Sequence, residues 1–94
     1  MPDTVSLRVR IEGRVQGVWY RGWAIQQASV RSLSGWVRNR MDGSVEALFS
    51  GPDACVQDML AACRHGPPAA LVTAVHVEPA EAPQQPGFCQ KPTE

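Results

Sequence analysis

The sequence lacks an excess of charge of either sign, because nine basic residues balance nine acidic ones. Proteins that bind a nucleic-acid backbone or an anionic membrane surface usually carry a basic excess. No apolar run approaches the length of about 20 residues that a membrane-spanning helix needs. We therefore expect no nucleic-acid or membrane partner, and any anion-binding site must be local.

Cysteine is also scarce. Cys55, Cys63 and Cys89 make an odd count, and their spacing shows neither a CxxC pair nor a zinc pattern with histidine. No secretory signal is evident ahead of them. We expect free thiols in a reducing, cytoplasmic environment, with Cys55 and Cys63 packed as small hydrophobic residues.

A single small domain accounts for the whole sequence. Ninety-four residues, 44% of them hydrophobic, suffice for one core but not for two. No internal repeat or low-complexity segment divides the chain. We expect one domain over residues 1–94, with its core over about 5–91.

Hydrophobic periodicity predicts the elements of this domain. Alternation with a period of two predicts strands at 5–12, 36–39, 45–49 and 71–77, with a short edge strand near Phe88. Helical spacing predicts one helix over 20–31 and a second helix that opens at Asp53. The second helix should turn four side chains toward the sheet: Val56, Met59, Leu60 and Cys63. This order is that of the ferredoxin-like α+β fold (βαββαβ), an antiparallel sheet with both helices on one face.

The segment Gly13–Trp19 connects the first strand to the first helix. Successive backbone N–H groups in such a loop can point into one concavity, and the helix dipole adds partial positive charge. Arg21 follows in the first helical turn, where a guanidinium can hold two phosphate oxygens at once. The loop has neither a Walker nor a dinucleotide-binding pattern. The residues alone leave two interpretations open, an anion site or a tight turn followed by an exposed arginine.

Asn39 is the second candidate, near the end of a strand that leads into the Asp42-Gly43 hairpin turn. Taken alone, it is typical of a turn asparagine that hydrogen-bonds to its own backbone. His65 and His76 are typical of structural or exposed positions. The sequence therefore shows no general acid or base beside the loop.

Two blocks of the sequence resemble the acylphosphatase family. The first is Gly13-Arg14-Val15-Gln16-Gly17-Val18-Trp19-Tyr20-Arg21, and the second is Gly35-Trp36-Val37-Arg38-Asn39. Further similar segments follow in the family's order, at Asp42-Gly43-Ser44-Val45-Glu46, Gly51-Pro52, Gly66-Pro67-Pro68-Ala69 and Val75-His76-Val77. The similarity runs from about Leu7 to Phe88, and paired blocks in this order are highly specific.

The resemblance implies an activity and the residues that perform it. Acylphosphatases have the ferredoxin-like fold and are hydrolases that cleave the carboxyl–phosphate anhydride of acyl phosphates. In this sequence Arg21 would bind the phosphate and Asn39 would orient the attacking water. Backbone amides would form a phosphate cradle, from Val15, Gln16, Gly17, Val18, Trp19 and Tyr20. The resemblance implies no metal and no cofactor; the expected partners are a small acyl phosphate and inorganic phosphate, and the expected state is a monomer.

This chemistry is compatible with the missing acid and base. An acyl phosphate releases a carboxylate whose conjugate acid has a pKa of about 4, so its departure needs no proton. The difficult part is to neutralise phosphoryl charge and to place water in line. The family mechanism, in which a substrate phosphate oxygen takes the water's proton, agrees with this.

The sequence departs from the family pattern at two places. Trp19 and Tyr20 stand where the family often has a smaller residue and a phenylalanine, and Trp19 would narrow the mouth of the site. Arg31-Ser32 stands where Leu-Gly is common. Serine in a left-handed helix cap would cost about 1 kcal/mol, which affects stability and the end of the first helix rather than the chemistry.

Two other classes of protein share parts of this pattern. An RNA-binding domain has the same order of elements, but it carries aromatic residues within an RNP signature and usually a basic face. Neither is present here. A regulatory module that resembles an acylphosphatase and binds an anion without catalysis is closer, since such modules precede larger carbamoyl-transfer proteins. The presence of both Arg21 and Asn39 favours an enzyme.

Overall fold

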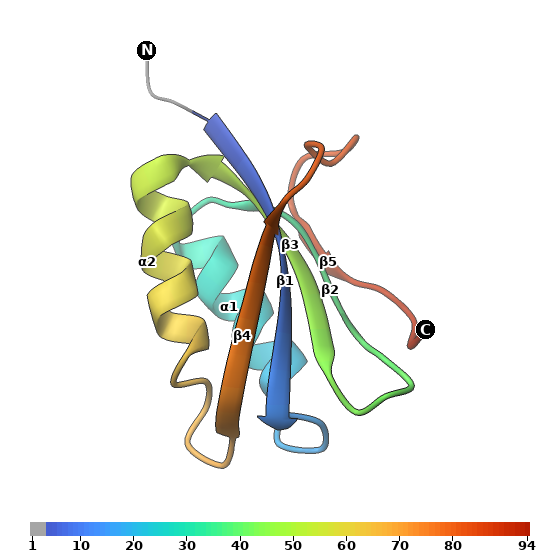
Figure 1. Cartoon of the computed structure of the whole chain (residues 1–94). Helices are drawn as coiled ribbons and strands as arrows, with labels where there is room; N and C mark the ends of the chain where they lie inside the picture. The colour runs from blue at the N-terminus through green and yellow to red at the C-terminus, as the bar shows by residue number, and fades with distance from the viewer. Residues whose placement is uncertain (1–3) are drawn as a thin grey trace.

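The computed structural model describes residues 4–94, so residues 1–3 of the expected domain lie outside it. One sheet has the strand order β4-β1-β3-β2-β5, and both helices cover one of its faces (Figure 1). In chain order the elements are β1 (Thr4–Arg14), α1 (Tyr20–Val30), β2 (Ser34–Asn39), β3 (Val45–Pro52), α2 (Asp53–Cys63), β4 (Leu71–Pro79) and β5 (Phe88–Gln90). The order from β1 to β4 is βαββαβ, which confirms the ferredoxin-like α+β fold.

The strand β1 lies between β3 and β4 and pairs antiparallel with both. Val9 and Ile11 are fully buried against the helices, whereas Arg8 and Arg10 are exposed on the other face, as the alternation predicts. The strand runs two residues beyond the predicted end at Glu12, with a bulge at Gly13. Gly13 has φ 125°, and a Cβ there would lie 2.8 Å from the backbone nitrogen of Thr73, so this crossing requires glycine.

The strand β5 makes the sheet mixed. The sequence predicted an antiparallel sheet, and this is wrong for one pair, because β5 runs parallel to β2 with Gly35 opposite Phe88 and Val37 opposite Gln90. The chain leaves β4 at one edge of the sheet and crosses over residues 80–87 to the opposite edge (Figure 1). At that edge β5 runs in the same direction as β2. No local pattern in the sequence predicts this direction.

The core lies between the helices and the sheet. The four α2 side chains that were predicted to face the sheet are all buried: Val56, Met59, Leu60 and Cys63. The buried side chains of α1 are Tyr20, Ala24 and Ala28. Cys63 is buried and Cys55 half-buried against this core, and both are free thiols, as expected.

Tyr20 ties the two helices together. Its hydroxyl donates a buried hydrogen bond of 2.7 Å to the carbonyl of Cys63, the last residue of α2. Carbonyls in the last turn of a helix have no partner inside the helix, so this bond satisfies one of them. The first turn of α1 is thereby fixed against the last turn of α2.

The end of α1 has the left-handed cap that the family pattern suggested. The helix ends at Val30 rather than Arg31, and Ser32 has φ 55°. The N–H of Leu33 donates to the carbonyl of Ala28 at 2.9 Å, and that of Ser32 to Ser29 at 3.0 Å. This is the Schellman motif, in which glycine usually occupies the position of Ser32. The serine side chain is therefore kept at a cost of about 1 kcal/mol.

Candidate active site

The loop between β1 and α1 lies at the end of the sheet where β1 terminates (Figure 1). It is shorter than predicted, because Gly13 and Arg14 belong to β1, and it spans residues 15–19. Gly17 has φ 74° and Trp19 has φ 67°, both in the left-handed region. Left-handed residues among right-handed ones curl a backbone so that neighbouring N–H groups can converge on an anion.

The N–H groups of this loop are available to a ligand. Within residues 4–94, the backbone N–H groups from Val15 to Gly22 donate no hydrogen bond to backbone or side chain, and the first such bond of the helix is that of Trp23 N–H to the carbonyl of Trp19 at 3.0 Å. Backbone donors normally find partners, and those at a helix N-terminus attract anions. The first turn of α1 contains no acidic residue that would compete for them.

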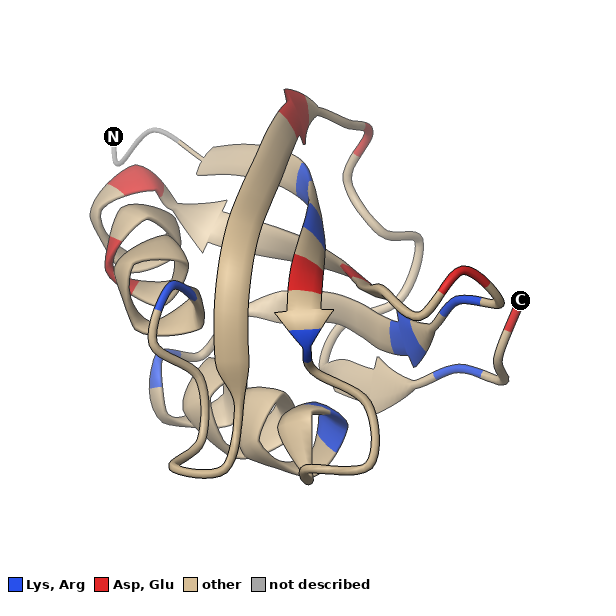
Figure 2. Cartoon of the chain, turned by 60° about the horizontal axis from the view of Figure 1, so that its bottom comes forward, with Lys and Arg blue, Asp and Glu red and all other residues tan. Residues whose placement is uncertain are grey.

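A small cavity of about 190 Å³ brings the candidate residues together. Its lining consists of Val15, Gly17, Trp19, Tyr20, Arg21, Gly22, Asn39 and Gln90. The structure thus gathers around one hollow the arginine, the asparagine and four of the six predicted cradle residues. The other two cradle residues, Gln16 and Val18, do not line it. Figure 2, in which this end of the molecule comes forward, shows basic segments at the end of β1 and in the first turn of α1.

The side chain of Gln16 has a role besides the one predicted for its backbone amide. Its side-chain amide donates two hydrogen bonds of 2.8 Å, one to the carbonyl of Arg40 and one to that of Ser44. Both carbonyls belong to the turn between β2 and β3. The loop that carries Arg21 is thereby pinned to the hairpin that carries Asn39.

Asn39 occupies the last position of β2, opposite Val45 of β3. It is not a turn asparagine bonded to its own backbone. Its Oδ1 is buried and accepts no hydrogen bond from any residue among 4–94. A buried carbonyl oxygen without a donor costs about 1–3 kcal/mol, so a water or ligand hydrogen at this point would be stabilised.

Sequence reasoning missed two residues that line the cavity, Gly22 and Gln90. Gly22 directly follows Arg21 in the helix, and its only sequence signal is a glycine inside a helical pattern. Gln90 reaches the cavity because β5 pairs with β2, where it lies opposite Val37. That pairing joins residues far apart in the chain, so no short-range signal identifies Gln90.

The lining offers no group suited to proton transfer. Among the lining residues only Tyr20 and Arg21 carry a titratable side chain. The Tyr20 hydroxyl points into the core toward Cys63, and burial together with this contact raises its pKa above the ordinary value. His65 lies exposed beyond α2, and His76 pairs with Glu12 at 3.0 Å. Neither histidine lines the cavity.

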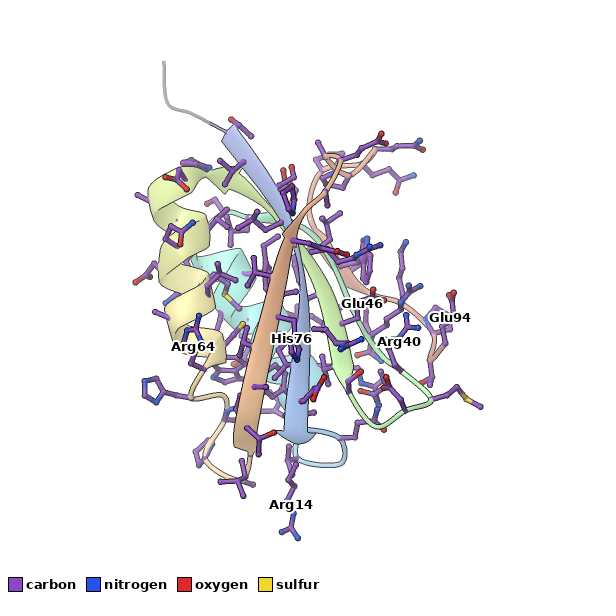
Figure 3. The ribbon with its side chains drawn as sticks, viewed as in Figure 1. Arg14, Arg40, Glu46, Arg64, His76 and Glu94 are labelled. Atoms are coloured by element: carbon purple, nitrogen blue, oxygen red, sulfur yellow. The ribbon has the colours of Figure 1, made fainter. Side chains whose placement is uncertain are left out.

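A larger hollow of about 450 Å³ lies on the face of the sheet opposite the helices, and its charges are paired with one another. Glu46 lies at its centre with a nearly buried side chain and binds Arg38 and Arg40 at 2.6 Å and 3.0 Å. Figure 3 shows Arg40, Glu46 and Glu94 on the same side of the molecule as the β2–β3 turn, with His76 beside β4 and β1. Arg38 and Arg40 therefore already have a carboxylate partner, unlike Arg21, for which no ion pair is found among residues 4–94.

Neither a metal cluster nor a membrane span emerges from the described part of the chain. Residues 4–94 contain no group of three or more His, Cys, Asp or Glu side chains that could hold a metal ion. None of their helices is both long enough and apolar enough to cross a membrane.

Comparison with known proteins agrees with the resemblance of the two blocks. The family model described as acylphosphatase matches residues 7–89. An acylphosphatase of Rhodospirillum rubrum is 61% identical over 88 residues, which cover 94% of this chain and 97% of the relative. An acylphosphatase of Rhizorhabdus wittichii is 49% identical over 92 residues, which cover 98% of this chain and 93% of the relative.

A solved structure shows the same architecture. The crystal structure of acylphosphatase from Bacillus subtilis superposes with a TM-score of 0.87 at 35% identity, covering 93% of this chain and 98% of that one. Fold, motif order and identity over nearly the full length thus agree. The chain belongs to the acylphosphatase family.

Proposed function

We propose that this protein hydrolyses acyl phosphates, cleaving the carboxyl–phosphate anhydride bond with water to give a carboxylate and inorganic phosphate. One observation carries the proposal: Arg21, Asn39 and a loop whose backbone N–H groups are free line a single small cavity. A phosphoryl group needs cationic and N–H donors, and an attacking water needs an acceptor.

Arg21 and the loop hold the phosphoryl group in this proposal. Arg21 is a half-buried residue whose guanidinium contacts the non-bridging oxygens, and the N–H groups of residues 15–20 complete the cradle. Donors fixed in advance around a developing charge lower the barrier without having to reorganise. The bonds from Gln16 keep this cradle in place against the β2–β3 turn.

Asn39 holds the attacking water. The water hydrogen-bonds to the side-chain amide of Asn39, and its oxygen then faces the phosphorus in line with the leaving carboxylate. No side-chain base lines the cavity, so the water's proton passes to a phosphate oxygen of the substrate. The P–O bond to the acyl group breaks, and the carboxylate leaves unprotonated because its conjugate acid has a pKa of about 4.

The reaction needs no resident metal or cofactor in this proposal. The only partners required are the small acyl phosphate and the phosphate product. We place the protein in the cytoplasm as a monomeric, single-domain enzyme over residues 1–94, without nucleic-acid or membrane binding. The balanced charge of the chain supports that last point.

The test is hydrolysis of benzoyl phosphate in EDTA by the wild type and by Arg21→Gln. We expect rapid turnover by the wild type and a loss of about three orders of magnitude in the variant, because its transition-state contacts disappear. Arg64→Gln is the matched control, since Arg64 is exposed directly after α2 and does not line the cavity (Figure 3).

The control should keep wild-type turnover. A folded wild type no faster than buffer would contradict the proposal and favour a regulatory anion-binding module. Near-normal turnover by Arg21→Gln would instead remove Arg21 from the mechanism.

A further inference from the structure

Trp19 has an unusual backbone conformation and an unusually exposed aromatic ring. It precedes α1 with φ 67° and ψ 23°. Residues other than Gly, Asn and Asp rarely adopt this left-handed backbone conformation. Trp19 is 59% exposed, so burial in the core does not explain a large aromatic residue here. A conformation held against its own preference at a ligand cavity motivates a functional explanation.

The indole ring lies over Gly22. A Cβ built on Gly22 would lie 2.6 Å from Cε2 and 2.7 Å from Cδ1 of Trp19, so the ring fills the space that a side chain at position 22 would need. Trp19, Gly22 and Arg21 all line the same cavity. The absence of a side chain at position 22 therefore leaves room for the aromatic ring against the first turn of the helix.

The Trp19 ring makes no hydrogen bond or aromatic contact within residues 4–94 that would explain its position. Its N–H donates no hydrogen bond to any residue in the described part of the chain. The aromatic contact of α1 with the core is made by other rings, because Tyr20 and Trp23 pack edge to face with centroids 5.2 Å apart. An exposed aromatic ring that lines a cavity is available to stack on a bound ligand.

We propose that the Trp19 indole is a platform for the acyl group, which makes this enzyme selective for acyl phosphates whose acyl group is planar and apolar. This inference rests on the proposed function. If Arg21 and the loop hold the phosphoryl group, the acyl group must extend out of the cavity past its rim. Arg21 is the only charged side chain in the lining and is engaged by the phosphate. A charged acyl group therefore finds no partner there, whereas a flat one stacks on the indole.

The test compares benzoyl phosphate with acetyl phosphate, which share the phosphate and differ in the acyl group. In Trp19→Gly the ratio of kcat/KM for benzoyl to acetyl phosphate should fall about tenfold, the size of one aromatic stack. Any effect of the substitution on the shared phosphate cradle cancels in this ratio. Trp19→Phe should keep most of the selectivity, because a flat ring remains.

Two further variants separate the ring from the backbone. Gly22→Ala displaces the indole without deleting it, so the ratio should fall there as well. Ser32→Gly relieves the other left-handed side chain, at the far end of α1, and should leave the ratio unchanged. An unchanged or increased ratio in Trp19→Gly would overturn the proposal, since Trp19 would then be an obstruction or a mere loop residue.

A binding measurement keeps this inference apart from the proposed function. By calorimetry, phenylphosphonate should bind the wild type about tenfold more tightly than methylphosphonate, and Trp19→Gly should abolish the difference. A protein that shows this preference but hydrolyses neither acyl phosphate would refute the catalytic proposal and support the platform. Hydrolysis of both substrates without any preference for phenylphosphonate would refute the platform alone.

Discussion

Asn39 is held in place by its backbone and not by its side chain. It pairs with Val45 in the ladder between β2 and β3, and its carbonyl accepts the N–H of Glu94 at 3.0 Å. Its side-chain oxygen has no donor within residues 4–94. Removal of the side chain therefore leaves the local fold supported, and a substitution reports on chemistry rather than on folding.

Asn39→Ala should lower kcat by about two to three orders of magnitude, because the water loses the group that positions it. The inhibition constant of inorganic phosphate should change by less than threefold or so, since Arg21 and the loop amides remain. Steady-state kinetics with phosphate as competitive inhibitor measure both. Equal losses in turnover and in phosphate affinity would make Asn39 a phosphate ligand instead.

Single residues differ in how far the sequence revealed them. Arg21 and Asn39 were identified as candidate site residues because their sequence blocks resemble a family. Their local pattern alone was equally compatible with an exposed arginine and a turn asparagine. The strain at Ser32 was also predictable, since a family glycine marks a left-handed position and the structure confirms φ 55° there. Gln90 was not predictable, because its approach to the site depends on a pairing between strands distant in the chain.

At the scale of elements, the side chain of Gln16 connects the loop between β1 and α1 to the β2–β3 hairpin. Gln16 donates to the carbonyls of Arg40 and Ser44, which also accept backbone bonds from Gly43 and Arg40. Gln16→Met keeps the size but loses both donors. It should cost about 1–2 kcal/mol in the free energy of unfolding and reduce kcat/KM, because the loop and Asn39 are no longer fixed relative to each other.

Urea unfolding and kinetics on benzoyl phosphate measure these two effects. Gln26→Met is the matched control, because Gln26 lies exposed on α1 and should tolerate the same change. If Gln16→Met loses stability but retains full kcat/KM, the two hydrogen bonds are purely structural.

The elements themselves were largely predictable, because alternation and helical spacing are local signals. The antiparallel pairing of β1, β2, β3 and β4 follows from the βαββαβ order. The parallel pairing of β5 does not, since it is set by a crossing from one sheet edge to the other over residues 80–87. The exact ends of β1 and α1 also escaped prediction, because a bulge and a capping residue decide them.

At the scale of the whole molecule, the face of the sheet opposite the helices is covered by paired charges rather than by a third layer. Glu46 is its central carboxylate, bound by Arg38 and Arg40 and approached to 3.8 Å by Arg8. Glu94 adds a second carboxylate to Arg38 at 2.7 Å. Acidic and basic side chains, which are equal in number in the sequence, thus form a network of ion pairs that covers this face of the sheet.

This network makes the stability of the fold depend on pH. Burial opposes the ionisation of Glu46, but the hydrogen bonds and charges of Arg38 and Arg40 outweigh it and hold the pKa of the carboxyl below its ordinary 4.5. A group whose pKa is lower in the folded than in the unfolded state stabilises the fold at pH values above the unfolded pKa. That contribution is lost as the pH falls through the folded pKa.

Glu46→Gln should therefore lower the free energy of unfolding by about 1–3 kcal/mol at neutral pH, because the arginines lose a charged partner. The difference from the wild type should shrink as the pH falls from about 4.5, where the carboxyl of the unfolded chain takes up a proton, through the lower pKa of the folded state. Glu81→Gln is the control, since Glu81 is exposed in the loop after β4. Urea unfolding at a series of pH values measures both variants, and a difference that stays constant down to strongly acidic pH would show that Glu46 acts through packing rather than charge.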